Sequence, residues 1–480
     1  KEKFRAGMDL YFARHDGEAA TVEQFIRCFA DASGRDMAQF MRWYSQAGTP
    51  EVTVNGHFDA ARKAFIVECR QNVPATPGQP TKEPMVIPLS IGLVGKNGRD
   101  LALKTGGGRP LEGQDIVLTE QTARFEFGDI GERPVLSINR GFSAPINLQT
   151  DLGIDDLAFL AAHDSDAFNR WQALQTISMR LLLDNVAAAR AGRPLRTDDR
   201  LVQAFAATIE DSNLEAAFVA LALILPGEGD IAREIGNDID PDAIFQTRTA
   251  LKAELGQRLD ARLADAYERM TVGVRYSPDA ESAGRRALRN AALDLLAASA
   301  APAGIARAVR QYQHADNMTD RMAALATLSL HNVPEREHAL ADFYDRYAGD
   351  ALVVDKWFSL QATTPHRDTL DHVRVLTTHP AFSLANPNRV RALIGAFAQG
   401  NSTQFNRLDG AGYDFIAETV LALDQKNPQV SARLATAFRN WRTMEDGRQV
   451  KAESALSRIR AASPLSRDLS DIVDRALAAP

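Results

Sequence analysis

The apolar residues of this chain change their spacing twice, and these two changes limit what it can fold into. Up to about residue 47 they recur three or four positions apart, as in helices. From Pro50 to Ile146 they alternate with polar residues, as in half-buried strands. Beyond residue 150 the helical spacing returns and persists to the end. The sequence therefore predicts a multidomain α + β chain, in which a short helical segment (1–48) is followed by a small β-sandwich (49–148) and a large superhelical all-α domain (149–480).

The first segment carries the start and stop signals of short helices. Thr21 and Gln24 have the spacing of a capping box, in which each side chain hydrogen-bonds the other residue's backbone N–H. Gly34 suits the left-handed position that ends a helix. Met37, Phe40 and Met41 have the spacing of one apolar face. These signals predict three helices.

The alternating region predicts about seven short strands separated by turns. Asn97-Gly98 is typical of a two-residue hairpin turn. Short strands over about 100 residues, with glycine and proline turns between them, are typical of a β-sandwich. The residues that mark the predicted strands are Val52 with Val54, Phe65 with Cys69, Ile87 with Leu93, Leu101 with Leu103, Ile116 with Leu118, Phe125 with Phe127, and Leu136 with Ile138.

One helix of the last domain combines an apolar face with a polar one. Asn427 is a suitable N-cap, and a proline follows it at the first helical position. Gln429 and Arg433 are four residues apart and therefore share a face. The residues of the apolar face are Val430, Leu434, Phe438 and Trp441. The other helices of this domain show no strict repeat, so we expect an irregular stack of helix pairs with a concave surface.

Composition narrows the classes of partner. The chain has 480 residues, a net charge of -7 and no basic stripe, which argues against nucleic acid. Cys28 and Cys69 are the only cysteines, so we expect a reducing compartment, the cytoplasm. The longest apolar run, 216–225, is too short to cross a bilayer, so no membrane partner is expected. Nothing suggests a coiled coil or a dimer stripe, and we expect a monomer.

A search for catalytic patterns finds none. No two of the nine histidines are four apart and none precedes a glutamate, so the zinc-peptidase pattern His-Glu-x-x-His is absent and we expect no metal in this chain. Ser143 lacks the glycine that should close a nucleophile elbow. The run 106–108 (Gly-Gly-Gly) has no Gly-Lys-Ser/Thr after it and is interpreted as a turn. The cluster of Arg285, Arg286 and Arg289 is interpreted as a solvated helix face.

Several longer motifs resemble one family across the whole chain. The similarity is to aminopeptidase N, a bacterial zinc metallo-aminopeptidase of the gluzincin class. The motifs that carry it are Leu10-Tyr11-Phe12-x-Arg14-His15-Asp16-Gly17, Arg42-Trp43-Tyr44-Ser45-Gln46, Phe142-Ser143-Ala144-Pro145, Asp166-x-Phe168-x-Arg170-Trp171, Asn317-Met318-Thr319-Asp320, Asp355-Lys356-Trp357-Phe358, Asn386-Pro387-Asn388-Arg389, and Asn427-Pro428-Gln429-Val430-x-x-Arg433-Leu434.

The resemblance implies a function for the complete protein. In that family a zinc ion in a thermolysin-like domain activates water, and one residue is removed from the N-terminus of a peptide. It implies that 1–48 is the tail of that catalytic domain, with the catalytic and zinc-binding residues upstream of residue 1. It also implies that the helical domain is a lid enclosing the substrate cavity, and that Gln429 and Arg433 face this substrate channel.

Two functions follow from these observations. The first is the C-terminal part of a zinc-dependent aminopeptidase acting on peptides, inactive by itself. The alternative is a non-catalytic helical scaffold that binds peptides or proteins on its concave surface. The chain opens without methionine inside a helical pattern, which favours the first.

Overall fold

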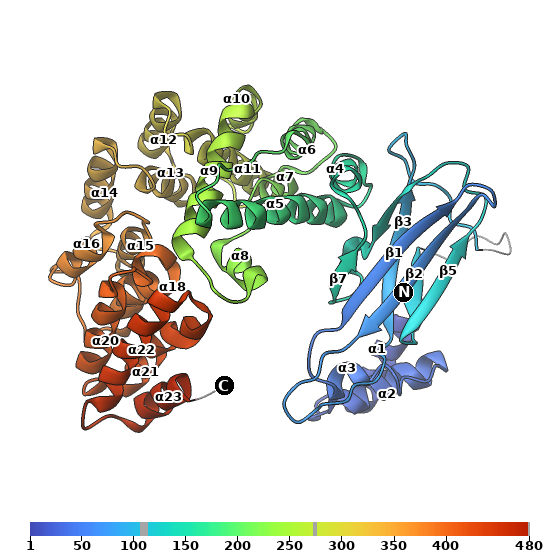
Figure 1. Cartoon of the computed structure of the whole chain (residues 1–480), viewed down its shortest axis with the longest axis horizontal. Coiled ribbons are helices and arrows are strands. Elements are labelled where there is room, and N and C mark those ends of the chain that lie inside the picture. Colours follow the sequence, from blue (N-terminus) through green and yellow to red (C-terminus); the bar gives the residue numbers. More distant parts are fainter. Residues whose placement is uncertain (106–113, 272–275, 479–480) are drawn as a thin grey trace. The chain divides into compact units, whose positions relative to one another are not determined.

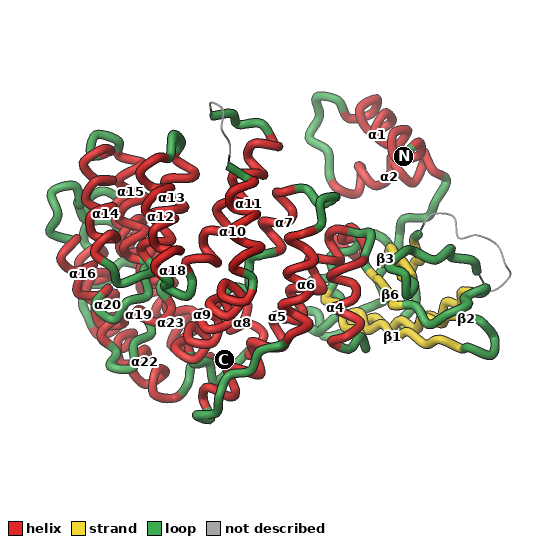
Figure 2. Tube along the Cα trace, turned by 90° about the horizontal axis from the view of Figure 1, so that it is seen from above, coloured by secondary structure: helices red, strands yellow, loops and turns green. Residues whose placement is uncertain are grey.

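The computed structural model describes residues 1–105, 114–271 and 276–478. The chain forms two compact units, Lys1–Leu174 and Gln175–Pro480. Figure 1 colours the chain from one terminus to the other, and Figure 2 shows that the strands of the described residues lie in the first unit. The expected fold class is confirmed: a short helical segment and a small β-sandwich precede a large all-helical domain.

The N-terminal helices follow their predicted signals closely, except for the third. The capping box of Thr21 and Gln24 is formed in both directions, and Gly34 ends its helix at a φ of 68°. The third helix covers only four residues, and the predicted face residues Met37, Phe40 and Met41 lie before it, beside a turn in which the Asp36 carboxylate accepts a hydrogen bond from the Ala38 backbone. The helices are α1 (Glu2–His15), α2 (Val22–Ser33) and α3 (Arg42–Ser45).

Side chains of the third helix and of the turn before it hold this segment against the sandwich. The Trp43 indole donates a hydrogen bond to the Val86 carbonyl at 2.9 Å. The Gln39 amide donates to the carbonyl oxygens of Pro84 and Thr119. The sequence run that includes Trp43 therefore has a structural role at the entrance of the sandwich.

The sandwich consists of a four-stranded and a three-stranded sheet. The strand orders are β5-β2-β1-β7 and β4-β3-β6, and all neighbours are antiparallel except β1 and β7. Val54 lies opposite Cys69, and both side chains point into the core between the sheets. The strands are β1 (Glu51–Asp59), β2 (Ala64–Asn72), β3 (Ile87–Val94), β4 (Asp115–Leu118), β5 (Thr122–Phe127), β6 (Val135–Ile138) and β7 (Asn147–Thr150).

One predicted strand is wrong and one strand was missed. The turn at Asn97-Gly98 forms, with Gly98 at a φ of 74°. Residues 101–103 nevertheless form no strand: the two leucines there pack on the core from an irregular segment. Pairing after the turn is limited to one isolated bridge between Val94 and Asp100, closed by the Leu101 backbone donating to the Leu93 carbonyl, and the Asp100 carboxylate binds Arg140. The missed strand, β7, has no buried residue and so lacks the apolar alternation that would have revealed it.

A buried arginine ties the sandwich to the loop that follows the next helix of the same unit. The Arg140 guanidinium forms ion pairs with Asp100 at 2.8 Å and with Asp164 at 2.9 Å. Its hydrogen bond to Asp100 holds the pKa of that carboxyl below its usual range. Ser143 donates to Asn139 and accepts from the Ser90 backbone, which is a turn-forming role. The helices here are α4 (Ile154–His163) and α5 (Ala167–Arg190), with η1 (Arg140–Phe142) before them.

The second unit is a succession of helices joined by short loops. Two large side chains of the motif at 355–358 are packing centres: Phe358 is fully buried, and the Trp357 indole donates to the Leu340 carbonyl. The helices are α6 (Asp199–Glu210), α7 (Ala216–Ala222), α8 (Glu228–Ile235), α9 (Pro241–Arg258), α10 (Asp260–Arg269), α11 (Ala280–Ala297), α12 (Pro302–His314), α13 (Met318–Ser329), α14 (Pro334–Tyr347), α15 (Ala351–Ala362), α16 (Thr369–Leu376), α17 (Pro387–Val390), η2 (Arg391–Gly395), α18 (Ala396–Gly400), α19 (Ser402–Phe405), α20 (Ala411–Asp424), α21 (Pro428–Ala435), η3 (Thr436–Thr443), α22 (Asp446–Ala461) and α23 (Arg467–Leu477).

Two further expectations concern the surroundings of the protein. Cys28 and Cys69 are both unbonded and buried, and they pack as small core residues. Burial raises the pKa of the Cys69 thiol to about 11. Across the described residues, no helix combines the length and apolar character needed to cross a membrane. The glycine run 106–108 lies outside the described residues.

Candidate functional site

The helix that carries Gln429 and Arg433 begins as its sequence predicts. The Asn427 side chain accepts a hydrogen bond from the Val430 backbone at 3.2 Å, and Pro428 occupies the first turn. The α-helix is shorter than predicted, because the chain tightens into the 3₁₀-helix η3 from Thr436. The Thr436 hydroxyl donates to the Arg433 carbonyl there, a local bond that competes with regular helix geometry.

The predicted apolar face of this helix forms despite the change of geometry. Leu434, Phe438 and Trp441 are buried, and Val430 is half-buried. The Trp441 indole also donates to the Ala476 carbonyl in α23. This anchorage fixes the opposite, polar face of the helix toward the surface.

Gln429 and Arg433 are both exposed and border one hollow of about 240 Å³. Their spacing of four residues places them on the same side of α21. The rest of the lining is apolar at its base and polar at its edge. The lining residues are Pro387, Val390, Arg391, Gly395, Gln399, Gln429, Val430, Arg433 and Leu434.

The facing wall comes from the helical run of α17, η2 and α18. Arg391, Gly395 and Gln399 recur every four residues along it. The middle of this run is a π-helix, a widened turn that often occurs at functional sites. Sequence reasoning missed Arg391 and Gln399. The detectable signal was the helical spacing of Val390, Ile394 and Phe397, which leaves Arg391 and Gln399 off the apolar face of the same helical run.

The polar groups of the hollow are available to a ligand. Within the described part of the chain, the side chains of Arg391, Gln399, Gln429 and Arg433 form no hydrogen bond or ion pair with other protein groups. Two guanidinium groups and two amides above an apolar base suit a carboxylate or the carbonyl groups of an extended peptide.

A second hollow shares Gln399 with the first. It has a volume of about 370 Å³ and is lined partly by aromatic side chains, including Phe405, Tyr413 and Trp441. Arg439 adds a third cation to this region. The two hollows thus give the second unit a continuous set of apolar and cationic lining residues around α18, α21 and η3.

The described residues do not offer a zinc site. No group of three or more histidine, cysteine, aspartate or glutamate side chains that could hold a metal ion occurs in residues 1–105, 114–271 and 276–478. Zinc in proteins needs such a set, with nitrogen, sulfur or carboxylate ligands close together.

The sequence-based interpretation of Arg285, Arg286 and Arg289 as a solvated helix face is wrong. Arg286 is only 5% exposed, and Arg289 is half-buried. Both border a hollow between α10, α11, α12 and the start of α13. The cause is close helix packing: α11 lies against α10, α12 and α13, and the Arg286 guanidinium carbon lies 4.7 Å from the centroid of the Tyr276 ring.

Comparison with known proteins identifies the family. A family described as "Domain of unknown function (DUF3458_C) ARM repeats" matches residues 154–478, and "Domain of unknown function (DUF3458) Ig-like fold" matches 48–151. The chain belongs to the DUF3458_C family, whose model covers more than half of it. In this family the Ig-like part corresponds to the observed sandwich, and the ARM-repeat part corresponds to the stacked helices.

The similar proteins of known identity are aminopeptidases. The chain is 36% identical to aminopeptidase N of Escherichia coli over 478 residues, 40% identical to that of Caulobacter vibrioides over 479, and 32% identical to that of Haemophilus influenzae over 477. These matches cover 99–100% of the chain and 53–54% of the relatives. The chain therefore spans about half the length of the curated relatives it matches.

A solved structure supports the same relationship. The crystal structure of Legionella pneumophila aminopeptidase A in complex with aspartic acid matches with a TM-score of 0.82 and 25% identity, over 99% of this chain and 54% of that one. The predicted resemblance to the C-terminal portion of aminopeptidase N is thus confirmed.

Proposed function

We propose that this chain is the C-terminal part of a zinc-dependent aminopeptidase and supplies one wall of its substrate cavity. The observation that carries the proposal is the hollow of about 240 Å³, where Gln429 and Arg433 meet Arg391 and Gln399 without internal partners. It occurs in a chain that is similar along its whole length to aminopeptidase N. The hydrolysis itself belongs to residues outside this chain.

The chemistry of the hollow suits the part of a peptide that leaves as the shortened product. Removal of one N-terminal residue requires the free amino group at the catalytic centre, so the remainder of the peptide extends away from it. Carbonyl oxygens and a terminal carboxylate then need donors, which the two arginines provide. The apolar base formed by Val390 and Leu434 can accept a side chain.

Zinc, peptide substrates and a cytoplasmic location enter only as parts of this proposal. Zinc would activate water in the complete enzyme, whereas this chain would bind and orient the peptide. The two unbonded cysteines support a reducing compartment. A monomeric state stays a prediction that size-exclusion chromatography can check. The absence of nucleic-acid and membrane partners also stays a prediction.

The test is substitution of Arg433 by alanine in the complete gene product. We expect turnover of tripeptides and longer peptides to fall, while hydrolysis of a small aminoacyl amide is retained, because the small substrate does not reach the hollow. Arg442→Ala is a matched control, since Arg442 lies on the following η3 segment and donates to carbonyls of α23 instead. Equal losses on both substrates would refute the channel role.

A peptide-binding assay separates the alternative scaffold function. A scaffold should hold peptides with the 480-residue chain alone and independently of a free amino group. The enzyme proposal instead expects full binding only when the complete gene product is present. One titration of the 480-residue chain with N-acetylated and with free peptides therefore distinguishes the two functions.

A further inference from the structure

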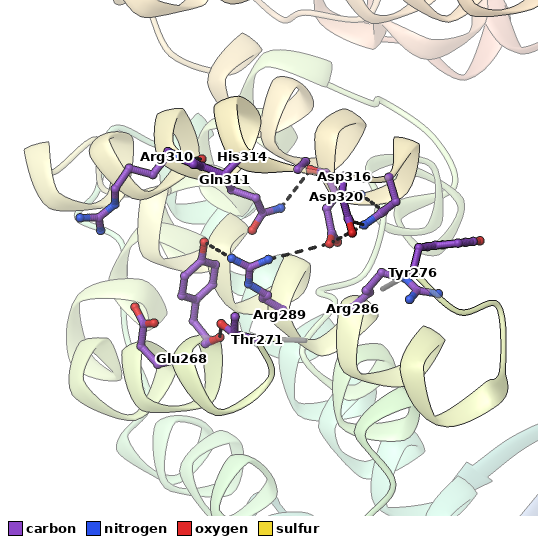
Figure 3. A pocket seen from close by; sticks show the side chains of 13 residues that line it. Glu268, Thr271, Tyr276, Arg286, Arg289, Arg310, Gln311, His314, Asp316 and Asp320 are labelled. Atoms are coloured by element: carbon purple, nitrogen blue, oxygen red, sulfur yellow. Dashed lines mark hydrogen bonds and ion pairs between the residues drawn. The ribbon is translucent and has the colours of Figure 1, made fainter. Parts of the chain in front are cut away.

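A third hollow of the helical unit, the one bordered by Arg286 and Arg289, lies away from Gln429 and Arg433 in the sequence. It has a volume of about 720 Å³ and is bordered by α10, α11, α12 and the loop before α13. Figure 3 shows the side chains of Arg289 and Gln311 directed into it from different helices. The proposed function makes no use of this hollow.

One carboxylate of the hollow is already satisfied by protein groups. Asp320 accepts hydrogen bonds from the side chains of Asn290 and Asn317, each at 3.0 Å. Arg289 approaches it at 3.8 Å and also donates to the Tyr267 hydroxyl at 3.0 Å. Asp320 is therefore the centre of an internal network and is not free to neutralise a further cation.

The remaining acidic groups of the hollow do not pair with Arg286 in the described part of the chain. Asp316 accepts from Asn317, and Glu268 is exposed to solvent. Among the described residues, no hydrogen bond or ion pair reaches the Arg286 guanidinium. Its one printed contact is the Tyr276 ring, with the guanidinium carbon 4.7 Å from the ring centroid.

The burial of Arg286 makes this arrangement unusual. Only 5% of the residue is exposed, and it borders the hollow. A guanidinium carries five N–H donors in a rigid fork, and removing it from water without partners is unfavourable. The aromatic ring compensates part of that cost from one face and leaves the N–H edges available.

Other unpaired groups in the same hollow have complementary character. The Nε of Arg289, one helical turn after Arg286, has no hydrogen-bond partner in the described part of the chain. Arg310 adds an exposed cation from α12. The buried Gln311 Oε1 also lacks a partner there and can accept a hydrogen bond from a hydroxyl or a protonated group of a ligand.

We propose that this hollow binds a small oxyanion, a carboxylate or a phosphate, on the Arg286 guanidinium. Both groups present two oxygen atoms at the spacing of the guanidinium fork. The site would be distinct from the hollow of Gln429 and Arg433, so a failure of either proposal leaves the other intact.

Isothermal titration calorimetry of the 480-residue chain tests the proposal. The probes are inorganic phosphate and succinate, each at constant ionic strength set with sodium chloride, which distinguishes the two anion classes. We expect saturable binding of at least one probe and a loss of about tenfold or more in affinity in Arg286→Met, because a hydrogen-bonded charge pair is removed. Absence of saturable binding of both probes would overturn the proposal.

Arg285→Met is the matched control on the same helix. Arg285 donates to the carbonyls of Arg269 and Thr271 and does not border the hollow. Its affinity for the probes should stay within about twofold of the parent chain, since it makes no contact with the anion. Equal affinity in the parent and Arg286→Met would contradict the assignment.

A measurement on the unmodified chain covers the case in which Arg286→Met does not fold. Crystals soaked in sodium selenate should show an anomalous peak within hydrogen-bond distance of the Arg286 guanidinium. Peaks only at other positions, or none, would overturn the proposal.

Discussion

Arg448 offers a demanding test of how the helical unit is held together. This residue of α22 is 1% exposed, and its Nε donates to the Asn406 carbonyl at 2.6 Å. Its guanidinium also pairs with Glu445 of the same chain segment and with Asp242 of α9. One buried side chain thus joins three segments that are distant in the sequence.

Substitution of Arg448 by methionine keeps much of the volume and removes the charge. It leaves Glu445 and Asp242 without their cation, and the Asn406 carbonyl without its donor. Removing one partner of a buried ion pair typically costs about 3–5 kcal/mol. Because Asp242 is half exposed and can regain water, we expect the lower end, about 3 kcal/mol.

The assay is urea unfolding followed by tryptophan fluorescence, with the transition of the helical unit fitted separately. Arg458→Met on the same helix is the control, since its pair with Asp414 is solvent-exposed and such pairs contribute about 0–1 kcal/mol. A loss below about 1 kcal/mol for Arg448→Met, or equal losses in both variants, would refute the reasoning.

Two further predictions concern a helix cap and a histidine of α16. Replacing Asn427 by alanine removes the acceptor for the Val430 backbone N–H and should destabilise the helical unit by about 1 kcal/mol. Amide hydrogen exchange in α21 should become faster, and unchanged exchange there would contradict the capping role. Burial lowers the pKa of His372 below its ordinary value of 6.5. The unfolded chain therefore binds the proton more readily than the folded chain, and the free energy of unfolding decreases as the pH falls through 6.5. Urea unfolding of the parent and His372→Gln between pH 7.5 and 5 should show a shallower acid loss in the variant, and parallel curves would exclude this contribution.

Features that depend on neighbouring residues in the sequence could be predicted well. The capping box at Thr21, the stop at Gly34 and the cap at Asn427 each involve groups within four residues, so their geometry follows from local chemistry. The alternation of β1 to β6 is equally local, because each buried strand must turn one row of side chains inward. The two halves of the fold could therefore be predicted before any tertiary contact was known.

Features that depend on tertiary packing could not be predicted. The strand β7 pairs in parallel with β1 although its own side chains are not buried, so its sequence carries no alternation. Arg286 has the sequence surroundings of a surface residue, and only the packing of α11 against α10, α12 and α13 buries it.

For the same reason, only two of the four polar residues of the candidate site could be predicted from the sequence. Gln429 and Arg433 share a helix face by spacing alone, whereas Arg391 and Gln399 reach the hollow only because a distant helical run packs beside α21. The widened π turn within that run depends on packing as well, since its sequence continues the ordinary helical pattern.

The most direct test of the substrate-facing role compares two forms of one tripeptide in the complete gene product. One form has a free C-terminal carboxylate and the other a C-terminal amide, and kcat/KM is measured for both. If Arg433 binds the carboxylate, Arg433→Met should lower kcat/KM about tenfold for the free acid, which corresponds to about 1.4 kcal/mol, and leave the amide within about twofold. Equal effects on both forms, or none on either, would contradict the assignment of this hollow to the substrate.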